Sequence, residues 1–164
     1  MALQVARAKG ATKIIMIGRG DRLRVAKELG ADHVVDITKE DPAEAVHALT
    51  GGLGANIGME CSGAPEALTP LTYAVSRGAK IAVIGLNGKK QVGIVTDRVA
   101  LDEVDLIGVR GSPSEYPHFI ALMAAGKVSG EGIVTHRYRL AEINEAMQAF
   151  RGRRGNAIRV AIQI

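Results

Sequence analysis

The feature that most constrains the fold is a short apolar stretch that ends in a glycine, an arginine and a second glycine. Residues 13–20 read KIIMIGRG, and four apolar residues in a row are typical of a strand buried on both faces, as in a parallel sheet. Residues 21–32 follow with the spacing of a helix, which Asp21 is expected to cap and Gly30 to end. Open α/β sheets bind ligands where such a strand ends and a helix begins. The stretch therefore indicates a nucleotide site.

Helices and strands are predicted to alternate along the chain. The predicted strands are 13–17, 33–37, 55–61, 80–85, 104–109, 134–138 and 157–164, and the predicted helices are 1–9, 21–29, 41–49, 65–77, 114–126 and 140–150. Beyond Gly85 the pattern is weaker, and residues 86–92 are predicted as a turn and an edge. The alternation predicts an α/β fold with a right-handed, doubly wound parallel sheet.

Length and composition exclude several classes of protein. The 164 residues suit one domain with a core. The 47% of hydrophobic and 23% of charged residues indicate neither disorder nor a membrane span, and no membrane partner is expected. One cysteine permits no intrachain disulfide, and the N-terminal residues show no cleavage-site pattern, so a cytoplasmic location is expected. The net charge of +4 suits a phosphate-bearing cofactor, whereas the 3% of aromatic residues give no stacking platform for nucleic acid.

The histidines, the cysteine and the densest basic cluster are given structural interpretations. No pair of them has the spacing of metal ligands, and surface or capping roles are expected for His33, His47, His118 and His136. Cys61 is interpreted as a small buried hydrophobic residue. The arginines of residues 151–156, RGRRGN, are interpreted as a solvated turn rather than as a nucleic-acid contact.

Five segments, taken in order, carry a resemblance to a known family. They are KIIMIGRG with RLRVAKELGADHVVD, GMECSGAPEAL, GAKIAVIGL, VDLIGVRGS, and THRYRLAEINEAMQAF with AIRVAI. The chain resembles the C-terminal part of the zinc-type medium-chain dehydrogenases, which include alcohol, polyol and threonine dehydrogenases. The resemblance implies a Rossmann-like, NAD(P)-binding domain of an oxidoreductase. In such an enzyme a hydride passes between a secondary alcohol or polyol and the nicotinamide.

Two parts of the family's pattern are missing from this sequence. No strand ends in G-x-G-x-x-G, so the first strand and the glycine-rich phosphate loop are absent. The zinc-binding catalytic domain is absent too, so neither zinc nor a catalytic residue is expected here. The isolated chain is expected to be inactive unless a catalytic domain is supplied. Residues 1–164 are then a single truncated domain, whose strand 157–164 packs on the absent domain in the family.

The missing strand is central in the family's sheet, and its absence predicts an unusual assembly. Strands 13–17 and 55–61 flank it, and each unpaired amide left in a core costs ~1 to 3 kcal/mol. Direct pairing of those two strands, insertion of strand 157–164, or exchange with another subunit are the ways to close the gap. A homodimer or larger oligomer is expected, most simply a dimer through the edge at 104–109.

The resemblance implies a cofactor site made of short segments. Gly18 stands where NAD-preferring members have an acid, so Arg19, assisted by Arg22, favours NADP over NAD. The alternative for this segment is a turn with a solvated arginine. Other implied contacts are the adenosine half at Cys61, Ser62 and Gly63, the nicotinamide at Ile84, Gly85 and Leu86, the carboxamide at Gly108 and Arg110, and the pyrophosphate at Arg159. The alternative for Gly85 is that it serves only the turn after its strand. The alternative for Arg159 is a solvated side chain.

A second function class stays open beside the dehydrogenase. The chain would then be a non-catalytic nucleotide-binding or oligomerisation module from a truncated reading frame, since the sequence starts abruptly within a helix. Turnover of alcohols would favour the dehydrogenase, and cofactor quenching without turnover would favour the module. Nucleic-acid binding is a minor third alternative.

Overall fold

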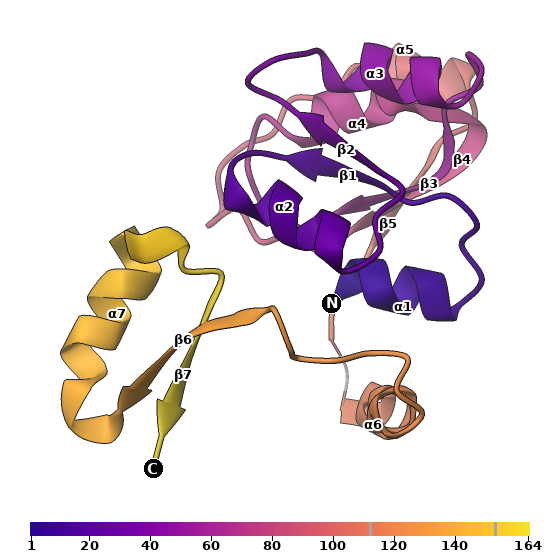
Figure 1. Cartoon of the computed structure of the whole chain (residues 1–164). Coiled ribbons are helices and arrows are strands. Elements are labelled where there is room, and N and C mark those ends of the chain that lie inside the picture. Colours follow the sequence, from indigo (N-terminus) through magenta and orange to yellow (C-terminus); the bar gives the residue numbers. More distant parts are fainter. Residues whose placement is uncertain (112, 153) are drawn as a thin grey trace. The chain divides into compact units, whose positions relative to one another are not determined.

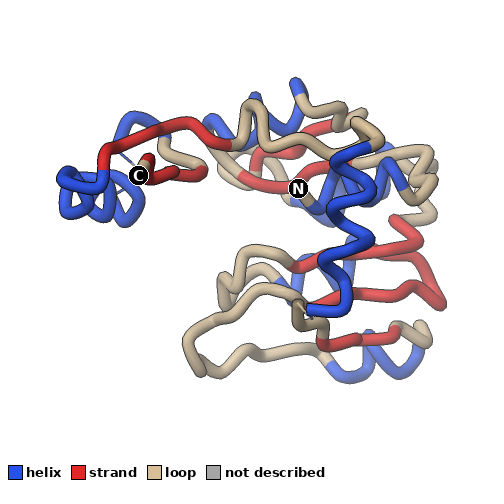
Figure 2. Tube along the Cα trace, turned by 90° about the horizontal axis from the view of Figure 1, so that it is seen from below, coloured by secondary structure: helices blue, strands red, loops and turns tan. Residues whose placement is uncertain are grey.

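Helices and strands alternate along the whole chain. The computed structural model describes residues 1–111, 113–152 and 154–164 (Figure 1). In chain order the elements are α1 (Ala2–Ala8), β1 (Ile15–Gly18), α2 (Asp21–Glu28), β2 (His33–Asp36), α3 (Pro42–Leu49), β3 (Ala55–Glu60), α4 (Leu68–Ala74), β4 (Val75–Val83), α5 (Thr96–Leu101), β5 (Asp105–Gly108), α6 (Tyr116–Ala124), β6 (Val134–Arg139), α7 (Ile143–Gly152) and β7 (Arg159–Gln163). Short 3₁₀ turns cover Pro113–Glu115, Leu140–Glu142 and Arg154–Asn156. Figure 2 shows the same alternation as a tube.

The strands of the described residues form three sheets. β1 pairs with β2, β3–β4–β5 follow one another in a three-stranded sheet, and β6 pairs with β7. The β3–β4, β4–β5 and β6–β7 pairs are all parallel. Glu60 lies beside Val83, and Val83 beside Gly108, so β3, β4 and β5 end at the same level. The predicted α/β class with parallel sheets is confirmed.

Contacts divide the chain into two compact units. The first unit contains residues 1–34 and 116–164, and the second contains residues 35–115. In the second unit α3, α4 and α5 lie together beside the three-stranded sheet (Figure 1). In the first unit α7 packs along β6 and β7. The expected single domain, with its last strand packed on a separate catalytic domain, stays a prediction.

The core of the second unit forms where β4 meets its neighbours. Val75, Ala79, Ile81 and Val104 are buried together. Burying an Ile or Val side chain contributes roughly 1.5 to 3 kcal/mol. At Gly58, on β3, a Cβ atom would lie 3.1 Å from Ile81 and 3.2 Å from Val75. The glycine therefore lets β3 approach this core closely.

The region around α4, β4 and α5 differs from the sequence prediction. β4 begins at Val75, within the predicted helix 65–77, and α5 was not predicted at all. Arg98 holds α5 in place, because its guanidinium forms an ion pair with Asp102 and donates to the Val75 carbonyl at 2.9 Å. It also lies 5.8 Å from the centre of the Tyr73 ring. The contacts with Val75 and Tyr73 are tertiary, so they give this six-residue helix no signal in local periodicity.

Two of the three alternatives for closing the gap at the missing central strand are not seen among the described residues, and exchange with another subunit stays a prediction. Strand 157–164 is not inserted beside β1 or β3, because β7 pairs with β6. Direct pairing of the two flanking strands is not seen either, since β1 and β3 belong to different sheets. β1 is also half-buried along its length rather than buried on both faces. Among the described residues β1 has one paired neighbour, which explains its partial exposure.

The sequence predicted the start of α3 correctly and the capping residue of α2 incorrectly. At α3, Asp41 accepts hydrogen bonds from the backbone of Ala43 at 2.8 Å and Glu44 at 3.0 Å, and Pro42 occupies the first turn. At α2 the capping position belongs to Gly20, and Asp21 is the first helical residue. The Gly20 backbone has φ 64° and ψ −153°, a region that favours glycine. Helix α2 therefore starts without a side-chain cap.

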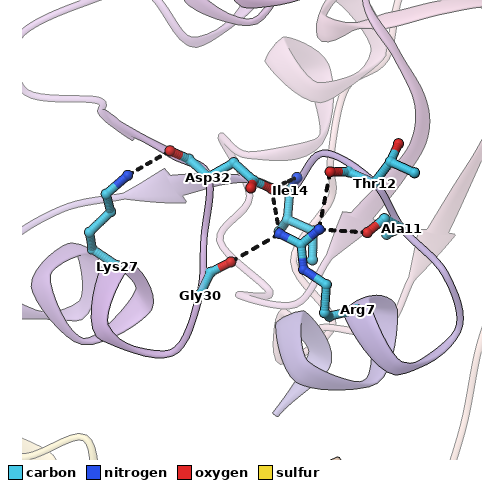
Figure 3. A network of polar contacts seen from close by, with 7 residues as sticks. All are labelled: Arg7, Ala11, Thr12, Ile14, Lys27, Gly30 and Asp32. Carbon is cyan, nitrogen blue, oxygen red and sulfur yellow. Dashed lines mark hydrogen bonds and ion pairs between the residues drawn. The ribbon is translucent and has the colours of Figure 1, made fainter.

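A polar network fixes the segment that leads into β1 (Figure 3). The Arg7 guanidinium donates to the carbonyls of Ala11 at 2.7 Å and Gly30 at 3.1 Å, and pairs with Asp32 at 2.5 Å. The Asp32 carboxylate also accepts from the Ile14 backbone at 2.6 Å. The hydrogen bond from Ile14, followed by that from Arg7, lowers the pKa of Asp32. The network joins α1 to the start of β1 and to the loop before β2.

Candidate functional site

In the first unit the candidate segment is the turn between β1 and α2. Gly18 ends β1, and a Cβ atom there would lie 3.4 Å from Leu23. A Cβ atom at Gly20 would meet nothing within 4 Å, so the backbone of this turn is open. Arg19 is exposed, and its side chain has no ion pair with a residue that the structure describes. The turn thus presents an exposed guanidinium beside open backbone, while Arg22 lies exposed in the first turn of α2.

In the second unit the candidate segments are organised by Glu60, which the sequence analysis missed. Its side chain is 6% exposed, at the end of β3. One carboxylate oxygen accepts from the Ser62 backbone at 2.8 Å, the Ser62 hydroxyl at 2.5 Å and the Gly63 backbone at 3.0 Å. The sequence gives no clear signal for this role, because the second turn that Glu60 contacts, at Ile84 and Gly85, lies more than twenty residues away. Glu60 therefore fixes the turn at Ser62 and Gly63.

The turns that follow β3 and β4 touch each other. The backbones of Ile84 and Gly85 donate to the Glu60 carbonyl at 2.8 and 3.0 Å. A Cβ atom on Gly63 would lie 2.3 Å from the Leu86 carbonyl oxygen, and one on Gly85 would lie 2.1 Å from the Gly63 nitrogen. Both positions therefore require glycine. The structure brings Cys61, Ser62 and Gly63 together with Ile84, Gly85 and Leu86, at the carboxyl ends of adjacent parallel strands.

The end of β5 adds a third turn at the same level of the sheet. The Val109 backbone donates to the Val83 carbonyl at 3.0 Å. At Gly108 and Gly111 a Cβ atom would meet nothing within 4 Å, and Arg110 is exposed. The predicted segment at Gly108 and Arg110 therefore lies at the carboxyl end of the strand beside β4, with open backbone.

Cys61 is exposed, which corrects its interpretation as a buried hydrophobic residue. Partial desolvation, and then the charge of Glu60, raise the pKa of its thiol. The thiol is therefore protonated at neutral pH, and a protonated thiol is a poor nucleophile. A reactive role for Cys61 is therefore disfavoured.

The structure also describes the contacts of two histidines and the exposure of the arginines near the C-terminus. Both ring nitrogens of His47 lie 2.9 Å from backbone carbonyls, those of Gly52 and Tyr73. His136 lies parallel to the Tyr138 ring, with 6.5 Å between the ring centres. Arg151 is exposed in α7, whereas Arg153 and the Arg154 side chain lie outside what the structure describes. Arg159 is exposed at the start of β7.

The described residues offer no site for a zinc ion. They contain no group of three or more histidine, cysteine, aspartate or glutamate side chains placed to hold a metal. A catalytic zinc needs three protein ligands. No step of a reaction can therefore be derived through zinc from this part of the chain.

None of the described helices is long and apolar enough to cross a membrane.

Glycine-containing turns at the carboxyl ends of parallel strands define the class of the chain, a Rossmann-like nucleotide-binding fold. Residues 1–125 match the family described as zinc-binding dehydrogenase, and the chain belongs to that family. It corresponds to the cofactor-binding part of the zinc-type alcohol and polyol dehydrogenases. The resemblance stated from the sequence is confirmed.

Individual relatives agree with this assignment. The chain is 32% identical to sorbitol dehydrogenase from Bacillus subtilis (strain 168), covering 90% of the chain and 42% of that protein. It is 34% identical to D-arabitol-phosphate dehydrogenase from Enterococcus avium, covering 98% and 46%. The structure of benzyl alcohol dehydrogenase from Acinetobacter calcoaceticus matches with a TM-score of 0.88 and 32% identity, over 99% of this chain and 46% of that one. The chain thus spans about half the length of these relatives.

Proposed function

We propose that the chain binds a nicotinamide dinucleotide for an alcohol or polyol dehydrogenase. The observation that carries the proposal is the contact between the turns after β3 and β4, where Gly63 packs on Gly85 and Leu86. Glu60 holds both turns in place through its carboxylate and its carbonyl. When bound, the nicotinamide supplies hydride transfer to or from a secondary alcohol or polyol. The residues of this chain bind and orient it.

Within the proposed site, each segment would contact a different portion of the dinucleotide. The absence of a side chain at Gly18 and the open backbone at Gly20 would leave room for the ribose. Arg19 with Arg22 would hold a 2′-phosphate, which favours NADP over NAD. Ser62 and Gly63 would face the adenosine half. Gly85 and Leu86 would lie along the nicotinamide. The segment of Gly108 and Arg110, whose backbone is open at Gly108, would hold its carboxamide. Arg159 would pair with the pyrophosphate.

No catalytic residue is proposed among the described residues. Zinc and the groups that move the alcohol proton would come from a catalytic domain, and we expect this chain alone to bind the dinucleotide without turnover. The non-catalytic alternative also predicts binding without turnover by the chain. Supplying a catalytic domain distinguishes the two, because only the dehydrogenase would then oxidise alcohols. A cytoplasmic location and a homodimer complete the proposal.

Titration of the full chain with NADPH, followed by nicotinamide fluorescence, tests this function. We expect saturable binding by the wild-type chain and at least about tenfold weaker binding by Gly85→Ala, because its Cβ atom would enter the Gly63 backbone. Gly93→Ala is the matched control, since a Cβ atom there meets nothing within 4 Å. A wild-type chain that binds neither NADPH nor NADH would contradict the proposal.

A further inference from the structure

The ring of His47 joins two helices of the second unit. His47 lies in the last turn of α3 and is half-buried. Its Nδ1 atom lies 2.9 Å from the carbonyl oxygen of Gly52, in the turn that follows α3. Its Nε2 atom lies 2.9 Å from the carbonyl oxygen of Tyr73, in the last turn of α4. The ring therefore bridges the end of α3 and the end of α4.

Both partners of this ring can only accept hydrogen bonds. A neutral imidazole carries one N–H group, so it can donate to the carbonyl of Gly52 or to that of Tyr73, but not to both. Its unprotonated nitrogen then faces a carbonyl oxygen at 2.9 Å, with no proton between them. An imidazolium carries two N–H groups and donates to both carbonyls. The geometry around His47 therefore matches the charged form of the ring.

The charges around the ring agree with this form. The carbonyls at the end of α3 carry partial negative charge, which attracts a cation in the last turn, and Glu44 lies one turn before His47. Tyr73 is the only titratable side chain in α4, and the turn after α3 contains none. In α5 the Arg98 guanidinium lies over the Tyr73 ring, but its charge is paired with that of Asp102. The surroundings of the ring therefore favour an imidazolium.

We propose that His47 is a pH-sensitive clamp between α3 and α4. In the folded chain protonation adds a second hydrogen bond between the ring and the two carbonyls, and the unfolded chain has no equivalent of it. Protonation of His47 therefore stabilises the fold. The stabilisation is fully present at a pH well below about 6.5, where a histidine of the unfolded chain is charged too, and it is lost at high pH, where the folded ring gives up its proton. The inference does not depend on dinucleotide binding.

Urea unfolding of the full chain at pH 5.5 and at pH 8.5 tests the clamp, with His47→Gln as the variant. The glutamine is neutral at both pH values. We expect the factor by which His47→Gln raises the unfolding equilibrium constant to be about tenfold larger at pH 5.5 than at pH 8.5, because only the charged ring makes both hydrogen bonds. His33→Gln is the matched control, since His33 is also half-buried and its ring forms no hydrogen bond with a described residue. The effect of the control should agree at the two pH values within about twofold.

Nitrogen NMR of the imidazole rings gives a second readout on the wild-type chain, so the test does not require the variant to fold. At pH 7, where a histidine in a peptide is mostly neutral, we expect both ring nitrogens of His47 to carry protons in most molecules. A single neutral tautomer of His47 at pH 7 would overturn the inference. So would an effect of His47→Gln that is equal at the two pH values, or an equally pH-dependent effect of His33→Gln.

Discussion

Arg19 is the residue on which the proposed cofactor preference depends. It follows Gly18, where an acidic side chain would repel a 2′-phosphate, and it is exposed beside open backbone. A guanidinium forms charge-assisted hydrogen bonds with a phosphate, whereas a ribose hydroxyl offers it no charge. The proposed preference for NADP therefore rests on Gly18 and Arg19.

Replacing Arg19 with alanine should separate the two cofactors. We expect the Kd for NADPH to rise about tenfold and the Kd for NADH to change by less than about twofold, because only NADPH carries the 2′-phosphate. Fluorescence titration with each cofactor measures both values, and Arg151→Ala serves as a charge-matched control outside the site. Equal losses for the two cofactors would contradict the assignment of Arg19.

Glu60 shows why some functional residues are found only in a structure. The sequence places an acid near the end of the predicted strand 55–61, a position that carries no known motif by itself. The structure shows that this carboxylate fixes the Ser62 and Gly63 turn, against which Gly85 packs. Its function depends on a partner more than twenty residues away, so it cannot be read from local spacing.

At the scale of elements, the Arg7 and Asp32 network links α1, β1 and the loop after α2. Asp32 accepts hydrogen bonds from Arg7 and from the Ile14 backbone, and these lower its pKa. A carboxyl whose pKa is lowered on folding stabilises the folded state above its unfolded pKa of about 4. That stabilisation is lost as the pH falls through the folded pKa.

Asp32→Asn should therefore have a pH-dependent effect on stability. We expect a lower urea midpoint than wild type at pH 7. The difference should shrink as the pH falls below about 4, where the Asp32 carboxyl of the unfolded wild-type chain takes up a proton before that of the folded chain. Asp36, whose pKa is lowered by Thr38, titrates in both proteins and cancels in the comparison. Glu66→Gln, at an exposed position, is the control. A difference that persists undiminished at pH 2.5 would rule out this role for the Asp32 charge.

Helix α7 differs from the simplest expectation for an amphipathic helix. Ile143, Met147 and Phe150 share one face, as predicted, but they remain 39%, 43% and 46% exposed. Ala146 and Ala149 are buried instead, at 2% and 4% exposure. The small side chains let the helix approach the two-stranded sheet closely. Periodicity predicted the helix, but the packing decided which of its residues are covered.

At the scale of the whole molecule, the exposed edge of strand β5 is the surface through which we expect two chains to pair. Among the described residues β5 pairs with β4 alone, and Ile107 and Val109 are each 43% exposed. An unpaired strand edge with apolar side chains is a template for pairing with another chain. This supports the proposed homodimer through residues 104–109.

Light scattering after size exclusion should then give a mass near twice the 17.2 kDa of the chain at micromolar concentration. Ile107→Lys should shift the protein towards the monomer mass, because a lysine on an edge strand opposes pairing. Leu53→Lys, at a position that is 75% exposed in a loop, controls for the added charge. A strictly monomeric wild-type chain would refute the dimer.

The sequence by itself determined the alternation of helices and strands, the glycine-containing turns and the family. Apolar periodicity and turn residues act over a few positions, so they can be read without a structure. Tertiary structure decided the pairing of β7 with β6, the position of α5, the glycine contact between the turns after β3 and β4, and the bridge that His47 forms between α3 and α4. These features depend on strand register and on contacts between distant residues, which local patterns do not specify.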